Sequence, residues 1–521
     1  MVRRHGRRLG VLTSGAGRRV SLRAKVSLRK RWRNDTGNQG IDPLRELTPE
    51  TLEELCQAVC EAEADGCAIR AVGSGHSWSD VALTDGLLVK PTGLTRPLDL
   101  QADQSLRAGA GEARPDGSRL VAVEAGMTIA ELNSYLEGLK LALPNMGGFD
   151  GQTVAGVIST STHGSGFEFG PLSDLVRSLD IVAAKGVVYR VERADGPTDP
   201  RAHAAAHPDR RLVQDDAWFR AVVVGMGCMG LIYSLMLEVV PLFHLREVRS
   251  MSTWSEVRAE LESGKAPAGR VHYEVLFNPY PRKDGEIETL ITTRTPLDRG
   301  KFRRDRRRSR SLAMELAARF PHTPLLINLA MGLWPKISPL LVAQALKALV
   351  NKDYVNVSYK VMNIGAANYL PAYSAEIGVP FDDRGLWVKA VERIVEVAAR
   401  RAVLGEVYHS SPISLRFVRG TDACMSMMEG QDTMMIELIM ATHTQGGEEL
   451  LGAHENALYE LGGRPHWGQI NSLTGSHGLI ASMYPRYEDW QEVHAQLNSS
   501  GVFDSPFSKR VGISRARFLR T

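Results

Sequence analysis

The stretch RAVGSGHSWSD, Arg70 to Asp80, completes a short apolar run, CAIRAV, that is typical of a β-strand. Gly73, Ser74 and Gly75 stand directly before His76, so an imidazole lies on a tight loop with few side chains around it. Glycine lets a ligand approach the main chain, and neighbouring N–H groups and hydroxyls can cradle an anion. The stretch therefore predicts a strand followed by a ligand-binding loop, although a plain turn explains the same letters when they are taken alone.

Helix and strand patterns alternate through the first half of the chain. Residues 48–66, TPETLEELCQAVCEAEADG, are typical of a capped amphipathic helix. Residues 120–148 repeat the order strand, glycine turn, helix, and residues 176–191 alternate like a β-hairpin. A glycine-punctuated turn at 224–230 leads into an apolar strand. We therefore expect one α+β domain over residues 41–243.

Beyond Pro241 the pattern becomes an alternation of apolar and polar residues, as in antiparallel strands. The alternating runs are 271–280, 285–295, 411–420 and 432–443. These runs predict a second domain, 244–485, with one large antiparallel sheet flanked by helices. The last residues, 486–521, are expected to pack back on the first domain.

Residues 301–350 interrupt that pattern. The segment KFRRDRRRSR has seven basic residues in ten, and the apolar run after it is broken by Pro335, Lys336 and Pro339. A run broken in this way cannot span a bilayer. A helical hairpin over the sheet is the plain interpretation. The alternative is a basic-flanked apolar surface that docks on a membrane or admits a lipophilic substrate.

The 521-residue chain is long enough for two or three domains. Residues 1–40 form a basic arm with twelve Lys or Arg and a single acid, Asp35. Such an arm usually stays solvated and can touch an anionic surface. No basic stripe is interleaved with aromatic residues, so we expect no nucleic-acid partner. Because we find neither a secretory signal nor a spanning helix, we predict a cytoplasmic protein, with the arm or the 301–350 insert as candidates for peripheral membrane contact.

The cysteines do not indicate a metal or disulfide framework. Cys56, Cys60 and Cys67 lie close together, but no fourth ligand has recognisable spacing. We expect buried thiols in a reducing compartment.

Six stretches, taken in order, resemble one family. They are RAVGSGHSWSD, VAVEAGMTIAELN, TVAGVISTSTHGSG, GMGCMGLIYSLMLEVVP, PISLRF and RPHWGQIN. With these stretches the chain resembles the PCMH-type flavin oxidases of the vanillyl-alcohol oxidase type, in the branch of sugar-1,4-lactone oxidases and alditol oxidase. The resemblance covers residues ~35–520. It implies an α+β fold in which FAD lies between two subdomains and a cap domain with a large antiparallel sheet covers the flavin ring.

The resemblance also implies which residues meet FAD. His76 would carry the flavin covalently through its 8α-methyl group, and the absence of Cys from residues 145–155 predicts a single attachment. The further cofactor-binding residues implied are Ala71, Val72, Gly73, Ser74, Gly75, Ser77, Gly148, Thr153, Gly156, Thr160, Ser161, Thr162, His163, Ile232 and, from the cap, His466. We predict no metal at His163, because no acidic or Cys partner stands at ligand spacing along the chain.

Oxidation of a C–OH group requires a base for the hydroxyl proton and a cation for developing oxyanion character. The relatives use a Glu-x-Arg pair on one cap strand and a Lys just after HWG. This chain keeps the Arg as Arg416 but has Ser414 and Gln469 at the other two positions, and Gly148 replaces a polar residue beside the flavin.

Two acids are candidates for the missing carboxylate. Glu437 stands in MMIELIM, which we expect to be the strand adjacent to Arg416, and a lone acid among apolar neighbours is costly to bury without a partner. Glu376 in AYSAEIGVP is the second candidate; otherwise Glu437 is a structural ion-pair member or faces solvent. The predicted catalytic group is Arg416, Glu437, Gln469 and His466.

The sequence thus predicts an FAD-dependent oxidoreductase that takes a hydride from the CH–OH group of a lactone or sugar-like alcohol. Its partners would be that small molecule and O2 or another electron acceptor. Loss of polar groups and the apolar insert leave a bulkier, sterol-like alcohol open. A flavin reductase or dehydrogenase of the same fold is the other alternative.

Overall fold

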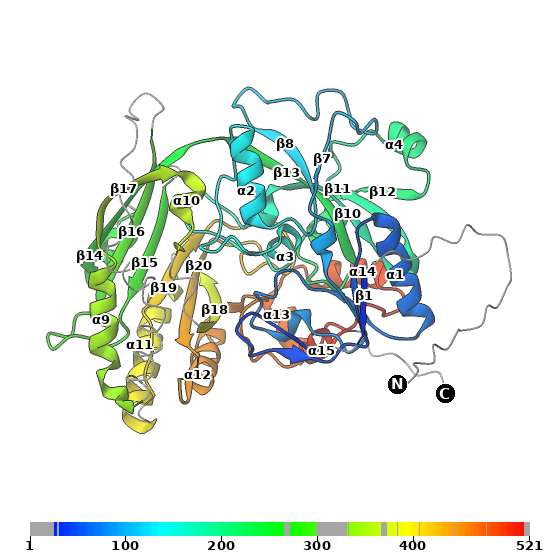
Figure 1. The fold of residues 1–521 in the computed structure, drawn as a ribbon. Helices are drawn as coiled ribbons and strands as arrows, with labels where there is room; N and C mark the ends of the chain where they lie inside the picture. The colour runs from blue at the N-terminus through cyan, green and yellow to red at the C-terminus, as the bar shows by residue number, and fades with distance from the viewer. Residues whose placement is uncertain are drawn as a thin grey trace, which may run out of the picture.

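The computed structural model describes residues 25–28, 31–264, 271–297, 331, 333–365, 372–382, 384–405, 407–442, 444–475 and 477–514. Two halves stand side by side in Figure 1. One half carries the N-terminal strands and helices, and the other is built on the strands that follow residue 243. The predictions for residues 1–24 and for the basic run at 301–310 lie outside the described residues.

The first half contains a small and a large sheet. In the small sheet the strand order is β1 (Lys25–Leu28), β4 (Arg45–Thr48), β6 (Leu87–Val89) and β5 (Ile69–Ala71). The order in the large sheet is β12 (Arg210–Gln214), β11 (Val188–Glu192), β10 (Val176–Val182), β13 (Leu231–Pro241), β8 (Arg119–Glu124) and β7 (Pro97–Leu98), with β9 (Leu141–Ala142) paired to β13. The pairing of β10 with β11 is antiparallel, which confirms the predicted hairpin.

Helices cover these sheets. They are α1 (Leu52–Ala64), α2 (Ile129–Gly138), α3 (Val154–Ser159), α4 (Pro200–Ala206) and α5 (Asp216–Val222). Helix α1 begins where the sequence indicates, because the Thr51 side chain accepts a hydrogen bond from the Glu54 N–H at 3.2 Å. It ends before Gly66, whose φ of +64° lies in the left-handed region. Its buried face packs Leu52, Leu55 and Val59 against the small sheet.

The second half is built on one large sheet. Within the described residues its order is β17 (Asn351–Val357), β14 (His244–Thr253), β16 (Glu288–Pro296), β15 (His272–Phe277), β19 (Ile413–Val418), β20 (Thr433–Ala441), β18 (Ala372–Pro380) and β21 (Arg464–Pro465). All these pairings are antiparallel. Strand β14 starts at His244, the residue at which the second domain is predicted to begin.

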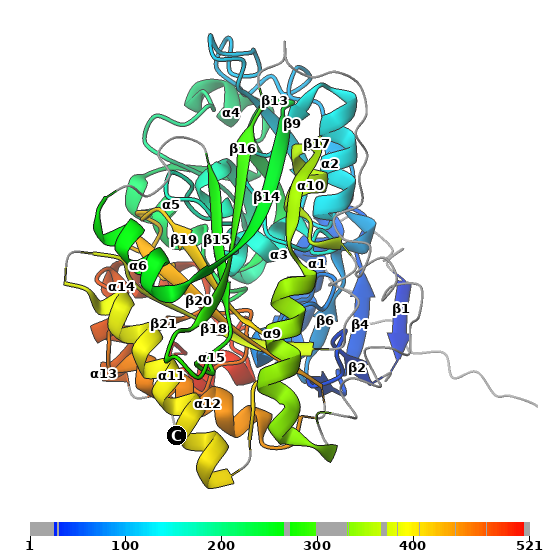
Figure 2. The same ribbon diagram turned by 90° about the vertical axis from the view of Figure 1, so that its left-hand side faces the viewer.

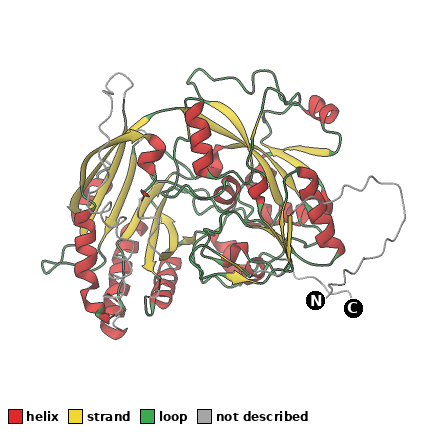
Figure 3. Cartoon of the chain, viewed as in Figure 1, coloured by secondary structure: helices red, strands yellow, loops and turns green. Residues whose placement is uncertain are grey.

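Alternation along these strands separates a core face from a polar face. Val275 and Phe277 of β15 pack into one apolar core with residues of the helices α6 (Trp254–Glu262), α11 (Leu386–Gly405) and α12 (Gly447–Tyr459). These helices and α9 (Ser338–Ala348) cover the face of the sheet that is turned away from the first half (Figures 1, 2 and 3). The polar residues between the core residues therefore face the other half. This is the predicted α+β architecture, and the fold class is confirmed.

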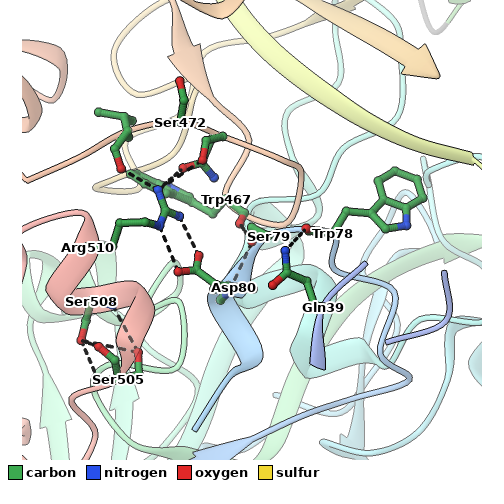
Figure 4. A network of polar contacts seen from close by, with 12 residues as sticks. Gln39, Trp78, Ser79, Asp80, Trp467, Ser472, Ser505, Ser508 and Arg510 are labelled. Atoms are coloured by element: carbon green, nitrogen blue, oxygen red, sulfur yellow. Dashed lines mark hydrogen bonds and ion pairs between the residues drawn. The ribbon is translucent and has the colours of Figure 1, made fainter. Parts of the chain in front are cut away.

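The C-terminal helices α13 (His477–Met483), α14 (Tyr487–Leu497) and α15 (Pro506–Arg510) return to the first half. Arg510 makes two hydrogen bonds to Asp80, at 2.9 and 2.6 Å, and also donates to the Asn471 carbonyl (Figure 4). One guanidinium therefore joins the chain end to the loop after β5 and to the HWG segment. No helix among the described residues has both the length and the apolar character needed to cross a bilayer.

Candidate active site

A cavity lies between the two halves and contains almost every predicted cofactor residue. The predicted residues that line it are Ala71, Val72, Gly73, Ser74, Gly75, His76, Ser77, Gly148, Thr153, Gly156, Thr160, Thr162, His163, Ile232 and His466. Arg416, Glu437 and Gln469 line the same cavity from the cap sheet and the loop after it. Ser161 is the exception among the predicted residues. Its backbone adopts a φ of +56°, and its buried hydroxyl bonds to that of Ser426 at 2.8 Å, so it does not line the cavity.

The loop after β5 presents bare backbone to this cavity. Within the described residues, none of the five N–H groups from Gly73 to Ser77 donates to a protein acceptor. Gly75 adopts a φ of +80°, and a Cβ at Gly73 would lie 2.3 Å from Thr153 Oγ1. Successive unpaired N–H groups around a left-handed residue form an anion-binding concavity. This loop therefore suits a diphosphate better than a plain turn.

Arg70 joins this loop to the glycine-punctuated turn at 224–230. Its buried guanidinium donates to the carbonyl of Val81 at 2.6 Å, and also to the carbonyls of Met226 and Gly227. Met226 and Gly227 both have positive φ values, so their carbonyls turn toward the arginine. Arg70 could not be recognised from the sequence, because one arginine in a strand has no distinguishing pattern.

His76 is enclosed on three sides. Its ring centroid lies 4.2 Å from that of Phe149 and 5.0 Å from that of Trp78. The Asp35 carboxylate contacts His76 Nδ1. Asp35 belongs to the part of the arm that the sequence predicts to be solvated. This part of the arm packs on the loop instead, because the side chains of Asn34, Asn38 and Gln39 donate to loop carbonyls.

The cap contributes a cluster of acids around one arginine. Glu274, Arg416, Glu437 and Glu376 stand on four consecutive strands, β15, β19, β20 and β18. Arg416 lies 3.4 Å from Glu274, 3.2 Å from Glu376 and 2.7 Å from Glu437, measured between nitrogen and oxygen. Ser414 is the direct cross-strand partner of Glu437. The carboxylate missing at Ser414 thus has a counterpart one strand away.

Glu376 also meets two histidines. Its Oε1 lies 3.4 Å from His163 Nε2, and His466 stands in the same group, with all three ligand-type atoms within 4.8 Å of one another. No partner for His163 is visible in the sequence, because Glu376 and His466 come from the cap, more than two hundred residues away. The same Glu376 oxygen already contacts Arg416, so a metal ion there would face a nearby fixed cation. We therefore interpret the group as an ion-paired cluster.

Proton positions follow from the partners. His163 Nδ1 lies 2.8 Å from the Gly164 carbonyl and must donate to it. That leaves His163 Nε2 facing the Glu376 carboxylate at 3.4 Å. His466 Nδ1 accepts from the Gly468 N–H at 3.0 Å. Burial lowers the pKa of His466 to about 4, against the opposing effect of Glu376.

Environment separates the pKa values of the acids. Burial alone would raise the pKa of Glu376, but His163 and Arg416 outweigh it and hold the pKa at about 2. Burial would likewise raise the pKa of Glu274, and Arg416 and Arg294 hold it at about 2. For Glu437 burial prevails over Arg416, with Glu376 adding repulsion, and its pKa is raised. Acids whose pKa values diverge in this way can take different chemical roles.

Apolar side chains line the space beside these acids. Ile439 and Ala372 line it from the cap sheet. Ile364 packs on Gly148, where a Cβ would lie 3.1 Å from the Ile364 side chain. This part of the cavity is therefore aliphatic. Gln469 accepts a hydrogen bond from the Ser374 hydroxyl at 2.6 Å, and that hydroxyl lies 3.3 Å from Glu437.

These residues fit FAD. Five unpaired N–H groups lie at the glycine-rich loop, and the buried Trp78 Nε1 has no hydrogen-bond partner among the described residues. The adjoining cap end supplies buried charge and proton-accepting groups. Such a combination suits a diphosphate linked to a redox ring better than a free anion.

Comparison with known proteins agrees with this geometry. The family profile described as FAD binding domain matches residues 43–192, and the profile described as D-arabinono-1,4-lactone oxidase matches residues 235–511. An L-gulono-1,4-lactone dehydrogenase of Mycobacterium tuberculosis is 26% identical over 486 residues, which cover 92% of this chain and 98% of that protein. An alditol oxidase of Streptomyces sp. is 26% identical over 466 residues, 88% of this chain and 93% of that one.

A solved structure titled solvent-stable cholesterol oxidase superposes with a TM-score of 0.73 at 15% identity, covering 96% of this chain and all of that one. At this identity the likeness concerns the fold. The resemblance inferred from the six stretches is confirmed, as is FAD as the cofactor.

Proposed function

This chain belongs to the D-arabinono-1,4-lactone oxidase family, and on that premise we propose that it oxidises the CH–OH group of a lactone or sugar-like alcohol. The observation that carries the proposal is the position of the Arg416 cluster. A guanidinium and a buried acid of raised pKa line the same cavity as the glycine-rich loop. FAD, when bound, accepts the hydride from the carbinol carbon.

We propose that His76 holds FAD covalently. Its place on the bare loop, its enclosure by Phe149 and the contact with Asp35 support this assignment. The unpaired N–H groups from Gly73 to Ser77 would hold the diphosphate. Thr153, which lies against Gly73, and Thr160 and Thr162 line the same cavity and would also contact FAD.

Glu437 is the group we assign as the base for the substrate hydroxyl. It lines the cavity, and its raised pKa keeps its proton affinity above that of an exposed carboxylate. Glu376 is the weaker candidate, because a carboxylate with a pKa of about 2 is a poor proton acceptor near neutral pH. Glu376 instead holds Arg416 and His163 in place.

Arg416, Gln469 and His466 complete the proposed catalytic group. Arg416 orients Glu437 through their 2.7 Å contact, and its partly open guanidinium is available to an oxygen that gains negative charge. Gln469 connects to Glu437 through Ser374. His466 remains neutral at physiological pH and lies next to Glu376 and His163.

A lipophilic alcohol is the second candidate substrate. Ile364, Ile439 and Phe149 line the cavity, whereas a polyol needs a series of hydrogen-bond partners along its chain. A sugar-1,4-lactone is more compact than an open-chain polyol, so its hydroxyls can meet the polar groups around Arg416. A sterol would require the apolar part to extend further.

Anaerobic bleaching with a substrate panel tests the proposed function. The holoenzyme is mixed without oxygen with sugar-1,4-lactones, alditols and a sterol, and the visible flavin absorption is followed. We expect a lactone to bleach it fastest. Exclusive bleaching by the sterol would establish the second candidate, and bleaching by no alcohol or lactone would remove CH–OH oxidation. Admitting air then separates an oxidase, which releases peroxide, from a dehydrogenase.

The predicted domain limits remain a proposal: an arm at 1–40, an FAD-binding domain at 41–243, a cap at 244–485 and a returning segment at 486–521. The strand boundary at His244 and the contact of Arg510 with Asp80 support them. Peripheral membrane contact also remains a proposal. Leu333, Trp334 and Leu340, which lie within the insert, are exposed, and flotation with anionic vesicles at low and high salt tests the contact.

A further inference from the structure

A row of buried charged side chains crosses the large sheet of the cap and ends at the active site. It begins with Glu247 and Arg249 on β14 and continues with Arg294 on β16 and Glu274 on β15, strands that Figure 1 shows side by side. Arg249 Nε lies 3.2 Å from Glu247 Oε1, and Arg294 Nε lies 2.8 Å from Glu247 Oε2. Arg294 Nη2 lies 3.4 Å from Glu274 Oε2. Positive and negative charges therefore alternate from β14 to the strand next to Arg416.

Glu274 connects this row to the proposed catalytic group, although it is not among the described residues that line the cavity. Its Oε1 lies 3.4 Å from Arg416 Nε and accepts a hydrogen bond from the Ser414 hydroxyl at 3.2 Å. Glu437 does line the cavity, and it contacts a different nitrogen of the same guanidinium, Arg416 Nη2. Glu274 can therefore influence the reaction only through Arg416 and Glu437.

The charges of the row do not balance. In the part of the chain that the structure describes, strands β14 to β18 bring together four carboxyl groups and three guanidinium groups, those of Glu247, Glu274, Glu376 and Glu437 and of Arg249, Arg294 and Arg416. Arg416 and Arg294 outweigh burial and hold the pKa of Glu274 at about 2. The pKa of Glu437 is raised, by burial first and also by repulsion from Glu376 and Glu274. The acid with the greatest affinity for a proton is thus the one at the cavity.

We propose that Glu274 is a positioning residue for the oxidation, which holds the guanidinium of Arg416 in place and strengthens Glu437 as a base. The proposal rests on the role of Glu437 proposed above. Glu274 contacts Nε of Arg416, and the two Nη groups contact the acids that line the cavity. The negative charge of Glu274 also partly offsets that of Arg416. The ionised form of Glu437 is therefore stabilised less, and it accepts the hydroxyl proton of the substrate more readily.

The groups around Glu437 determine how far this effect reaches. The charged or titratable groups that face it are Arg416 on β19, Glu376 on β18 and Glu274 on β15, with His163 and His466 next to Glu376. A unit charge roughly 8–10 Å away, in a medium of effective dielectric constant ~20, changes a pKa by about 1. Removing the charge of Glu274 should therefore lower the pKa of Glu437 by about 1.

Three variants separate this role from a structural one. Glu274→Gln loses the charge, while Arg294 keeps its contact with Glu247 and Arg416 keeps its contacts with the cavity acids. Arg294→Gln is the second variant, because it leaves Arg416 as the main counter-charge of Glu274 and should change the pKa of Glu437 in the opposite direction. Glu247→Gln is the matched control. It removes another buried acid that lies between two arginines, but Arg294 separates it from Arg416.

Two readouts follow Glu437 across pH in the full-length holoenzyme. Infrared difference spectra without substrate record the carboxyl band of protonated Glu437, which is assigned by its loss in Glu437→Gln. Anaerobic flavin reduction by L-gulono-1,4-lactone records the fall in rate as the base becomes protonated.

We expect Glu274→Gln to move both midpoints about one pH unit lower, and Arg294→Gln to move them higher. Glu247→Gln should move them at most about half as far as Glu274→Gln, since the Coulomb energy falls with distance. An infrared midpoint that stays at the wild-type value in Glu274→Gln, or that moves lower in Arg294→Gln, overturns the inference alone. If the midpoints move as expected but Glu437→Gln reduces flavin at the wild-type rate, Glu437 is not the base, and the role of Glu274 in the oxidation is lost with it.

Discussion

Replacing Glu437 and Glu376 one at a time by glutamine should slow flavin reduction to very different extents. The two replacements should also change the stability of the fold in opposite directions. Glu437→Gln removes the proposed base, so flavin reduction should slow by about 10²–10⁴-fold, or ~3–5 kcal/mol of barrier. Glu376→Gln keeps the proposed base Glu437, and the amide oxygen can still accept a hydrogen bond from Arg416, so it should slow reduction much less. Both changes preserve volume, so packing is not the variable.

Their effects on stability should also differ in sign. The folded-state pKa of Glu437 is raised, so its ionisation costs stability as pH rises through that pKa, and glutamine removes this cost. Glu437→Gln should therefore be at least as stable as wild type at alkaline pH. The pKa of Glu376 falls from 4.5 to about 2, which corresponds to about 3 kcal/mol of stability above pH 4.5 that is lost as pH falls toward 2. Glu376→Gln should lack that contribution.

Anaerobic stopped-flow reduction and melting curves across pH measure the two effects on the same preparations. In wild type the reduction rate should fall as pH decreases through the raised pKa of Glu437, because the protonated acid cannot accept the hydroxyl proton. Glu437→Gln should lose that pH dependence. The reasoning is refuted if Glu437→Gln reduces flavin at the wild-type rate, or if it is destabilised more than Glu376→Gln at neutral pH.

Three further changes test other parts of the account. Arg416→Ala leaves buried carboxylates without their common cation, and we expect denaturant unfolding to show a loss of about 3–5 kcal/mol together with ~100-fold slower flavin reduction; unaltered reduction would remove Arg416 from the mechanism. Gly73→Ala places a Cβ 2.3 Å from Thr153 Oγ1, so FAD titration of the apo-protein should give weaker binding, and wild-type affinity would contradict the proposed cradle. Arg510→Ala removes the contacts to Asp80 and should lower the unfolding free energy by about 1–3 kcal/mol, whereas an unchanged denaturation midpoint would show that this joint adds nothing.

Local signals in the sequence were enough to predict the fold class and most of the residues that line the cavity. The glycine-rich loops need bare backbone, so their composition is visible in the letters. The alternation over 271–280, 411–420 and 432–443 reflects one buried and one polar face of each strand, which is why the antiparallel sheet was predictable. Glu437 was suggested for the same reason, as a lone acid in an apolar strand.

Contacts between site residues on distant strands leave no local pattern, so Glu376 could be named only as the second candidate acid, and Glu274 and Asp35 were not named as site residues. Glu376 meets Glu437 and Arg416 because β18 pairs with β20 rather than with a strand next to it in sequence. Glu274 stands between apolar residues of a strand, as a solvent-exposed residue of an antiparallel sheet would, yet its side chain contacts Arg416. Asp35 was treated as part of a solvated basic arm, although it is the only acid in residues 1–40. That exceptional charge was the available signal.

The central claim is that the loop RAVGSGHSWSD holds FAD through His76. The most direct measurement is acid precipitation of the purified holoenzyme, followed by proteolysis and mass analysis of the fluorescent peptide. We predict that the flavin stays with the protein, in one peptide that spans Arg70–Asp80, with its mass on His76. Flavin that remains in the acid supernatant, or that maps to a different residue, would contradict the account.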